Sequence, residues 1–439
     1  MKILIIDPEK KVTHRISKDT SGGYGTGNDF GDTLVPVFLK KTLKKVHDWP
    51  PMFAVYTMSA LKQNGHIVDY QKNLLNDYNQ YDLFIVVSSI VCCETECEYI
   101  KKLSKLKKKI FVIGPYATNM PEKYIEAGGQ VIMGEPEFFF LKPQDLNSIG
   151  HDKSIIFDHN YNLDDLPYPD WGSVVKNNKT SLLFGIDKSL PILATRGCPY
   201  SCFKYCVYPL QQGRKPRQRD PKLIVDELEY WSKNFNVKMF IFRDPVFSIN
   251  KTHTMEFCDL LISRNLDIKF VIETHLRILD SELIDVLKKA GLKAVKVGVE
   301  SFDDNVRKES GRFSVSNDQQ LKKIRELETK NIKVSAMYIL GFPTDTDETI
   351  NKTINYSKKL NTAYAQFSVW TPYPGTPVYS EYKDKINVEK YENFDQYQLV
   401  YNHKLFNKNE IRNYLSKAYT AYYLRINWIF KYFRSFITS

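Results

Sequence analysis

Three cysteines lie close together, as Cys198, Cys202 and Cys206. This spacing can bring three thiolates to one metal centre. An apolar run at 191–195, typical of a strand, leads directly into them. Three thiolates from one loop leave one iron of a four-iron cluster without a protein ligand, and such an iron can bind a small chelating ligand and pass it one electron. The sequence therefore predicts an iron–sulfur site on a loop that follows a strand.

A zinc knuckle or a set of buried thiols is the alternative for these cysteines. A structural zinc needs four ligands, and no histidine or fourth cysteine lies near enough in the sequence to supply one. A second group, Cys92, Cys93 and Cys97, falls where a strand is expected to lead into a helix. We interpret this group as small packing residues, because cysteine is often buried and adjacent cysteines rarely ligate one centre well.

Strand-like and helix-like segments alternate along most of the chain, which predicts an α/β fold with parallel sheets. Residues 1–150 contain apolar runs at 3–6, 66–70, 83–87, 110–113 and 130–133. Residues 188–380 contain six such runs, at 191–195, 238–242, 270–272, 294–299, 334–340 and 365–370. We expect a doubly wound, Rossmann-like parallel sheet in the first part. A connector at 151–187 and a C-terminal helical extension at 381–439 complete the expected organisation.

The cysteine loop resembles that of the radical SAM family. The usual spacing in that family is Cys-x3-Cys-x2-Cys; Lys204 is an extra residue here, while Tyr205 keeps the family's aromatic position before the last cysteine. The resemblance implies a [4Fe–4S] cluster on the three cysteines and S-adenosylmethionine (SAM) on the open iron. It also implies a partial (β/α)6 barrel over 188–380, with reductive cleavage of SAM to a 5′-deoxyadenosyl radical at the carboxyl ends of its strands.

Motifs at the other strand ends extend the resemblance and imply residues that contact SAM. Asp244 follows the second strand and would face the methionine moiety. Glu300 and Ser301 belong to a Gly-x-Glu-Ser motif and would bind the ribose or the amino group. Gly341, in a Leu-Gly-Phe-Pro stretch, would pack on the adenine, and Tyr205 completes this set. No catalytic acid or base is assigned.

Residues 1–150 resemble the cobalamin-binding-like domain that precedes many radical SAM domains. The matching stretches are Ile-Gly-Pro-Tyr-Ala-Thr at 113–118, where the family often has Gly-Gly, and Met-Gly-Glu-Pro-Glu at 133–137. No Asp-x-His-x-x-Gly motif offers a lower cobalt ligand, so cobalamin binding stays open. The first hypothesis that the resemblance implies is a methyltransferase that uses cobalamin to methylate an unactivated carbon. Without cobalamin, cyclisation, rearrangement or oxidation is implied, and Lys204 leaves a third alternative, an inactive binding protein with a degenerate cluster site.

Composition and charge narrow the substrates, electron donors and cellular compartment that we expect. The net charge is +11, but no nucleic-acid-binding module follows the barrel, so we expect a small-molecule or lipid-linked substrate and an electron donor such as flavodoxin or ferredoxin. Seven cysteines without a disulfide pattern indicate the cytoplasm. The aromatic and basic stretch 419–436 predicts a helix that packs on the barrel or contacts the inner membrane face peripherally.

Overall fold

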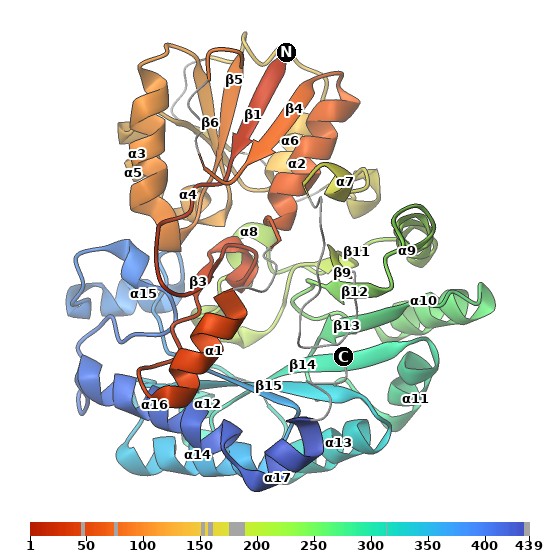
Figure 1. Ribbon diagram of the computed structural model, residues 1–439, viewed down its shortest axis with the longest axis vertical. Coiled ribbons are helices and arrows are strands. Elements are labelled where there is room, and N and C mark those ends of the chain that lie inside the picture. Colours follow the sequence, from red (N-terminus) through yellow and green to blue (C-terminus); the bar gives the residue numbers. More distant parts are fainter. Residues whose placement is uncertain are drawn as a thin grey trace.

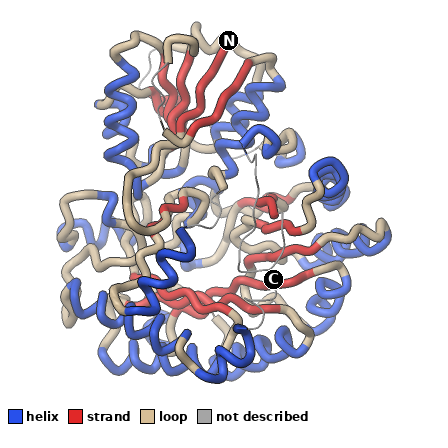
Figure 2. Tube along the Cα trace, in the orientation of Figure 1, coloured by secondary structure: helices blue, strands red, loops and turns tan. Residues whose placement is uncertain are grey.

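The computed structural model describes residues 1–44, 49–73, 78–150, 154–156, 161–174, 189–312 and 314–433. Two six-stranded parallel sheets organise these residues, one above the other in Figure 1. Helices surround both sheets, as the blue segments of Figure 2 show. The predicted α/β class with two parallel sheets is confirmed.

The N-terminal sheet, sheet A, has the strand order β4-β1-β5-β6-β7-β8. Its strands span Lys2–Ile6 (β1), Ile67–Gln71 (β4), Leu83–Val87 (β5), Lys109–Ile113 (β6), Gln130–Met133 (β7) and Ser154–Ile156 (β8). Its central strands β1, β5 and β6 are almost entirely apolar because helices cover both faces of a parallel sheet. The helices are Met52–Gln63 (α2), Cys93–Ser104 (α3), Pro115–Asn119 (α4), Glu122–Glu126 (α5) and Pro136–Leu141 (α6). Because β8 pairs with β7, the sheet continues into the segment that the sequence assigns to the connector.

A segment between β1 and α2 crosses from sheet A towards the second sheet (Figure 1). It contains the short antiparallel pair β2 (Ile16–Ser17) and β3 (Thr26–Gly27), a single 3-10 turn between them, and the helix α1 (Leu34–Lys44). These elements are not predicted from the sequence, because two-residue strands carry no usable periodicity.

The second sheet, the barrel sheet, has the order β16-β15-β14-β13-β12-β9. The six predicted strands are all present, as Ser189–Ile192 (β9), Met239–Phe242 (β12), Lys269–Glu273 (β13), Leu292–Glu300 (β14), Lys333–Leu340 (β15) and Tyr364–Val369 (β16). The intervening helices include Pro221–Phe235 (α9), Lys251–Ser263 (α10), Ser281–Lys289 (α11), Asp304–Glu309 (α12), Asn317–Thr329 (α13) and Asp347–Leu360 (α14). Parallel strands place their carboxyl ends at one edge, which is where a barrel of this kind holds its chemistry.

The C-terminal helix α16 (Lys408–Tyr423) covers the outer edge strand β16 (Figure 1). The Tyr419 hydroxyl accepts a hydrogen bond from the Phe367 amide at 3.1 Å and lies 2.9 Å from the Phe367 carbonyl. The Tyr423 hydroxyl makes the same two contacts with Ala365. It accepts a hydrogen bond from the Ala365 amide at 3.1 Å and lies 2.8 Å from the Ala365 carbonyl. Side chains thus satisfy backbone groups that an edge strand would otherwise expose.

The aromatic stretch at 419–436 therefore packs on the barrel in its described part. Trp428 and Tyr432 are buried, whereas Ile426 and Phe430 are exposed. Residues 434–436 lie outside the described residues. Within the described part of the chain, no helix is both long enough and apolar enough to cross a bilayer.

Removing the Tyr419 hydroxyl tests this edge contact. We expect Tyr419→Phe to lower the free energy of unfolding by ~1–3 kcal/mol, because it leaves buried backbone groups of Phe367 without a partner. Urea denaturation measures the change. Tyr414→Phe is the matched control, because its hydroxyl bonds Asp347 at an exposed position. Equal effects of the two substitutions would contradict the role assigned to Tyr419.

The N-terminal crossing segment also contacts α16. The guanidinium of Arg412 lies 2.8 Å from Asp29 and 2.7 Å from Asp32, just before α1 begins. Thr33 and Thr420 share a hydrogen bond of 2.8 Å. The chain just before α1 thus packs against α16.

Candidate functional site

The three cysteines lie on a loop at the carboxyl end of β9. After β9, the short strand β10 (Thr195–Arg196) pairs with β11 (Arg217–Gln218), and the loop between them carries the cysteines. The additional residue, Lys204, ends a 3-10 turn over Ser201–Lys204, and its side chain is exposed. The Cys206 amide still donates to the Cys202 carbonyl at 3.0 Å. The turn therefore accommodates the extra residue while the hydrogen bond between the second and third cysteines is kept.

The donor set of this loop fits an iron–sulfur cluster. Cys198 and Cys202 are 6 % and 7 % exposed, Cys206 is partly buried, and all three thiols are free. A hydrogen bond from Cys206, followed by the nearby Arg312, lowers the pKa of Cys202 to about 6, which favours the thiolate that binds metal. Among the described residues, no three His, Cys, Asp or Glu side chains converge on a single ion. Ligands of separate irons in one cluster stand further apart than ligands of one ion.

Arg312 joins the cysteine loop to the end of β14. Its Nη1 lies 3.8 Å from Cys202 Sγ, while its Nη2 donates to the Gly298 carbonyl at 2.9 Å and lies 3.5 Å from Glu300 Oε1. A Cβ at Gly298 would collide with both the Glu300 carboxylate and Arg312. Glycine at 298 is thus needed for this arrangement. Arg312 is not predicted from the sequence, because a single arginine in a loop carries no motif.

Glu300 is held in an unusual position. A bulge interrupts the pairing of β14 with β15 between Gly298 and Glu300, and Glu300 has a φ of +67°, which is rare for a residue with a side chain. Burial raises the pKa of Glu300 to about 7, against the opposing influence of Arg312. The strained backbone turns this carboxylate towards Arg312 beside the cysteine loop.

The other predicted SAM-contacting residues divide into two groups. Tyr205 packs edge-to-face on Phe342, next to Gly341, whose φ is +73°. These residues meet beside the cysteine loop. Ser301 contacts a different element: it is buried, and its hydroxyl is 3.2 Å from that of Thr353 in α14.

Asp244 supports the start of the cysteine loop. Its Oδ1 accepts hydrogen bonds from the amides of Ala194, at 2.9 Å, and Thr195. Its Oδ2 has no hydrogen-bond partner within the described residues. Burial raises the pKa of Asp244 to about 7. One oxygen thus positions the backbone that leads to Cys198, and the other is left for an additional donor.

Partly buried charges at the mouth of the barrel complete the site. Arg243, at the end of β12, lies 3.0 Å from Asp19 of the crossing segment. Burial lowers the pKa of Lys296 on β14 to about 8 and raises that of Glu273 at the end of β13. The sequence gives no sign of Asp19 or Lys296, because their proximity depends on long-range packing.

An ion-pair cluster fastens sheet A to the cysteine loop. Arg196, two residues before Cys198, pairs with Glu137 and lies 3.2 Å from Glu135, both at the start of α6. Arg217 of β11 holds Glu135 with two hydrogen bonds, at 2.9 and 2.5 Å. We call Arg196, Arg217, Glu135 and Glu137 the interdomain clamp. The clamp thus holds β10, the short strand that precedes the cysteines, against the α6 end of the sheet A domain.

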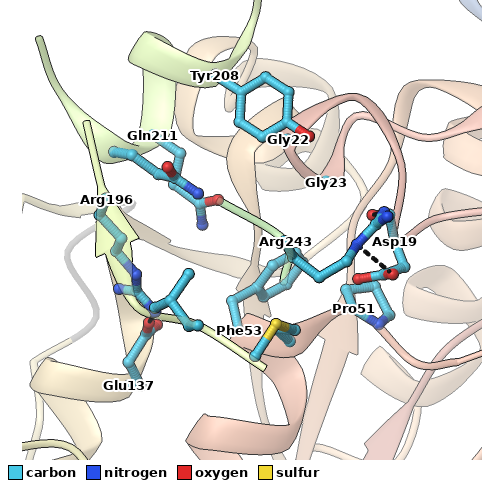
Figure 3. Close-up of a pocket in the computed structure, with 13 residues that line it drawn as sticks. Asp19, Gly22, Gly23, Pro51, Phe53, Glu137, Arg196, Tyr208, Gln211 and Arg243 are labelled. Atoms are coloured by element: carbon cyan, nitrogen blue, oxygen red, sulfur yellow. Dashed lines mark hydrogen bonds and ion pairs between the residues drawn. The ribbon is translucent and has the colours of Figure 1, made fainter. Parts of the chain in front are cut away.

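A small cavity lies between the two sheets, with a volume of about 50 Å³. Figure 3 shows two ion pairs at this cavity, Asp19 with Arg243 and Glu137 with Arg196. Tyr208 and Gln211, from the helix α8 (Tyr208–Gln212) that follows the cysteines, also line it.

Comparisons with known proteins agree with this geometry. Residues 192–357 match the family model of the radical SAM superfamily. An uncharacterised methyltransferase of Pyrococcus horikoshii is 25 % identical over 413 residues, covering 86 % of this chain and 88 % of that protein. The bacteriochlorophyllide d C-8(2)-methyltransferase of Chlorobaculum tepidum is 26 % identical over 368 residues, covering 79 % of each.

Among solved structures, the chain is similar to the radical SAM methyltransferase TsrM of Kitasatospora setae, determined with cobalamin and a [4Fe–4S] cluster. The TM-score is 0.61 at 16 % identity, with 87 % of this chain and 74 % of that chain covered. This likeness extends over both sheets and shows a shared fold. The family match falls on the barrel sheet and its cysteine loop. Residues 192–357 therefore form a radical SAM domain, and this family implies a [4Fe–4S] cluster and SAM as cofactors.

Proposed function

We propose that this protein is a radical SAM enzyme that cleaves SAM reductively and starts radical chemistry on an unactivated carbon. The observation that carries the proposal is the set of three free cysteines at the carboxyl end of the barrel sheet, with Arg312 against Cys202. One electron delivered to the SAM sulfonium yields methionine and a 5′-deoxyadenosyl radical, which takes a hydrogen atom from the substrate.

The chain's own residues would bind and orient the reactants. Cys198, Cys202 and Cys206 would hold the cluster. Arg312 would fix the loop and offer its charge to a carboxylate, and Glu300 would accept hydrogen bonds from the amino or ribose groups of SAM.

The remaining cofactor contacts follow from the strand ends. The free Oδ2 of Asp244 would receive an ammonium, and Tyr205 with Gly341 would pack on the adenine. Ser301 would act through the strand, since its hydroxyl already bonds Thr353.

Two outcomes for the substrate radical are supported by different observations. The names of the relatives favour methyl transfer to carbon. The small cavity between the sheets favours cyclisation, rearrangement or oxidation, because it leaves little room for a second large cofactor. In both cases we propose a small-molecule or lipid-linked substrate and a small electron-transfer protein, flavodoxin or ferredoxin, as the reductant. We place the reaction in the cytoplasm, where free thiols persist; peripheral membrane contact would have to come from exposed residues near Phe430.

Anaerobic reconstitution with iron and sulfide tests the proposed function. We expect four irons and four sulfides per chain, as in one [4Fe–4S] cluster, and formation of 5′-deoxyadenosine from SAM when dithionite is added. A chain that binds the cluster but never cleaves SAM would instead be the inactive binding protein that Lys204 suggested.

Arg312 should influence the reduction potential of the cluster. Its positive charge near a ligand sulfur favours the reduced, more negative cluster, so Arg312→Gln is expected to shift the midpoint potential to more negative values. A potentiometric titration followed by electron paramagnetic resonance measures this shift. Arg312→Lys is the matched control, because it keeps the charge. An unchanged potential in Arg312→Gln with full iron content would contradict this role.

A further inference from the structure

The carboxyl edge of sheet A is where an open α/β sheet holds its ligand. Ligands enter at the point where the strand order changes direction, which lies between β1 and β5 in the order β4-β1-β5. Asp7 follows β1, and Ser88 follows β5. A cofactor carried by this sheet, such as cobalamin, would have to enter at this crevice.

Lys18 of the crossing segment occupies the crevice. Its ammonium lies 2.9 Å from Asp7 Oδ1 and 2.7 Å from Glu96 Oε1, and it donates to the carbonyl of Val87 at 3.2 Å. The Lys18 side chain is 2 % exposed. Withdrawing one partner of a buried ion pair leaves the others charged and unpaired, at a high free-energy cost. A ligand could therefore enter only by breaking this network.

Tyr24 fills the neighbouring part of the crevice. Its ring is fully buried and meets Tyr116 and Tyr373 edge-on, with centroids 5.9 and 5.5 Å away. Its hydroxyl donates to the Pro374 carbonyl at 2.9 Å, and its own carbonyl accepts from the Ile90 amide at 2.9 Å. Tyr24 is thus attached to sheet A and to the barrel at once.

Glycines allow the segment to lie this deep. A Cβ at Gly23 would be 2.9 Å from Phe53 and 2.9 Å from Pro115. A Cβ at Gly25 would be 2.7 Å from Val91. Both glycines have positive φ angles, of +92° and +87°. The close contacts show a segment packed directly onto the sheet.

The residues present do not fit a cobalamin. Pockets for small molecules and cofactors measure roughly 300–1,000 Å³, whereas the cavity between the sheets measures about 50 Å³. The rest of the crevice is taken up by Lys18, Tyr24 and their partners.

We infer that the segment Ile16–Gly27 is the resident occupant of the sheet A crevice and that this protein performs its radical chemistry without cobalamin. The chemistry itself rests on the proposed function; the exclusion of cobalamin rests on the packing alone. Of the two reaction classes above, the inference favours hydrogen abstraction followed by ring formation, rearrangement or oxidation.

The segment has a second task at the barrel mouth. Asp19 follows Lys18 directly and pairs with Arg243 at the end of β12. Gly22 approaches α8 so closely that a Cβ there would lie 3.2 Å from Tyr208 Cα (Figure 3). The segment thus packs on sheet A on one side and contacts the carboxyl ends of the barrel strands on the other.

Cobalt retention tests the inference. The full chain is reconstituted anaerobically with iron and sulfide, incubated with excess hydroxocobalamin or methylcobalamin, and desalted. We expect a full iron content and a cobalt signal equal to the buffer blank. A second readout is the melting temperature, which a ligand of the native state would raise; we expect no shift with either cobalamin. Hydrogen exchange at the Ile90 amide, which bonds Tyr24, should likewise be unchanged.

The possible outcomes separate this inference from the proposed function. Cobalt equimolar with the chain, or a raised melting temperature with cobalamin, would overturn the inference. Blank cobalt together with 5′-deoxyadenosine formation would support both claims. Blank cobalt without any SAM cleavage would support the closed crevice and refute the proposed reaction.

Discussion

Replacing Cys202 with serine should abolish cluster assembly and SAM cleavage together. The substitution leaves two thiolates where three are needed, and it removes the sulfur that Arg312 contacts. After anaerobic reconstitution we expect iron and sulfide to fall to background, the broad visible absorbance of the cluster to vanish, and no 5′-deoxyadenosine to form.

Cys258→Ala provides the matched control for this experiment. Cys258 is also a free, fully buried cysteine, but it lies in α10 away from the loop. We expect this variant to keep its iron and its activity. A Cys202→Ser protein that retained a full cluster would show that the loop does not ligate it.

The second large effect is expected from the interdomain clamp. Arg196→Gln leaves the carboxylates of Glu135 and Glu137 buried, with Arg217 as the remaining cationic partner. Burial already raises the pKa of Glu137. Breaking a buried pair from one side costs ~3–5 kcal/mol, and we expect the free energy of unfolding to fall by about that amount.

Urea denaturation followed by circular dichroism measures this loss. Lys222→Ala is the control, because its exposed pair with Asp226 should contribute at most ~0.5 kcal/mol. The double variant Arg196→Gln, Glu137→Gln should lose less than the sum of the single losses, because the second change removes the uncompensated charge. Additive losses would mean that Arg196 and Glu137 do not act as a pair.

The sequence was sufficient for the strands of the two large sheets, apart from β8, and for the position of the cysteine loop. Fully buried parallel strands are short, continuous apolar runs, so β5 and β12 can be located from local composition alone. The three cysteines stand close together in the chain, and their chemistry follows from their type and spacing. Apolar runs and cysteine spacing are local patterns, so they can be recognised in the sequence without a structure.

The rest of the site depends on contacts between distant residues. Arg312 reaches Cys202 across 110 positions, and Asp19 reaches Arg243 across 224. Neither pair leaves a pattern in one sequence. Asp244 could be predicted only in part. Its position at a strand end follows from the sequence, but its hydrogen bonds from the Ala194 and Thr195 amides depend on the turn that follows β9.

The contact between α16 and the edge of the barrel sheet has a consequence for synthesis. The ribosome delivers α16 well after β16, so the outer strand keeps unsatisfied amide and carbonyl groups until Lys408–Tyr423 has emerged. The segment before α1 must also wait, because Arg412 is its anchor. The outer strand and the segment before α1 are therefore both completed only after α16 has emerged, so these parts of the protein cannot be assembled strictly in order of translation.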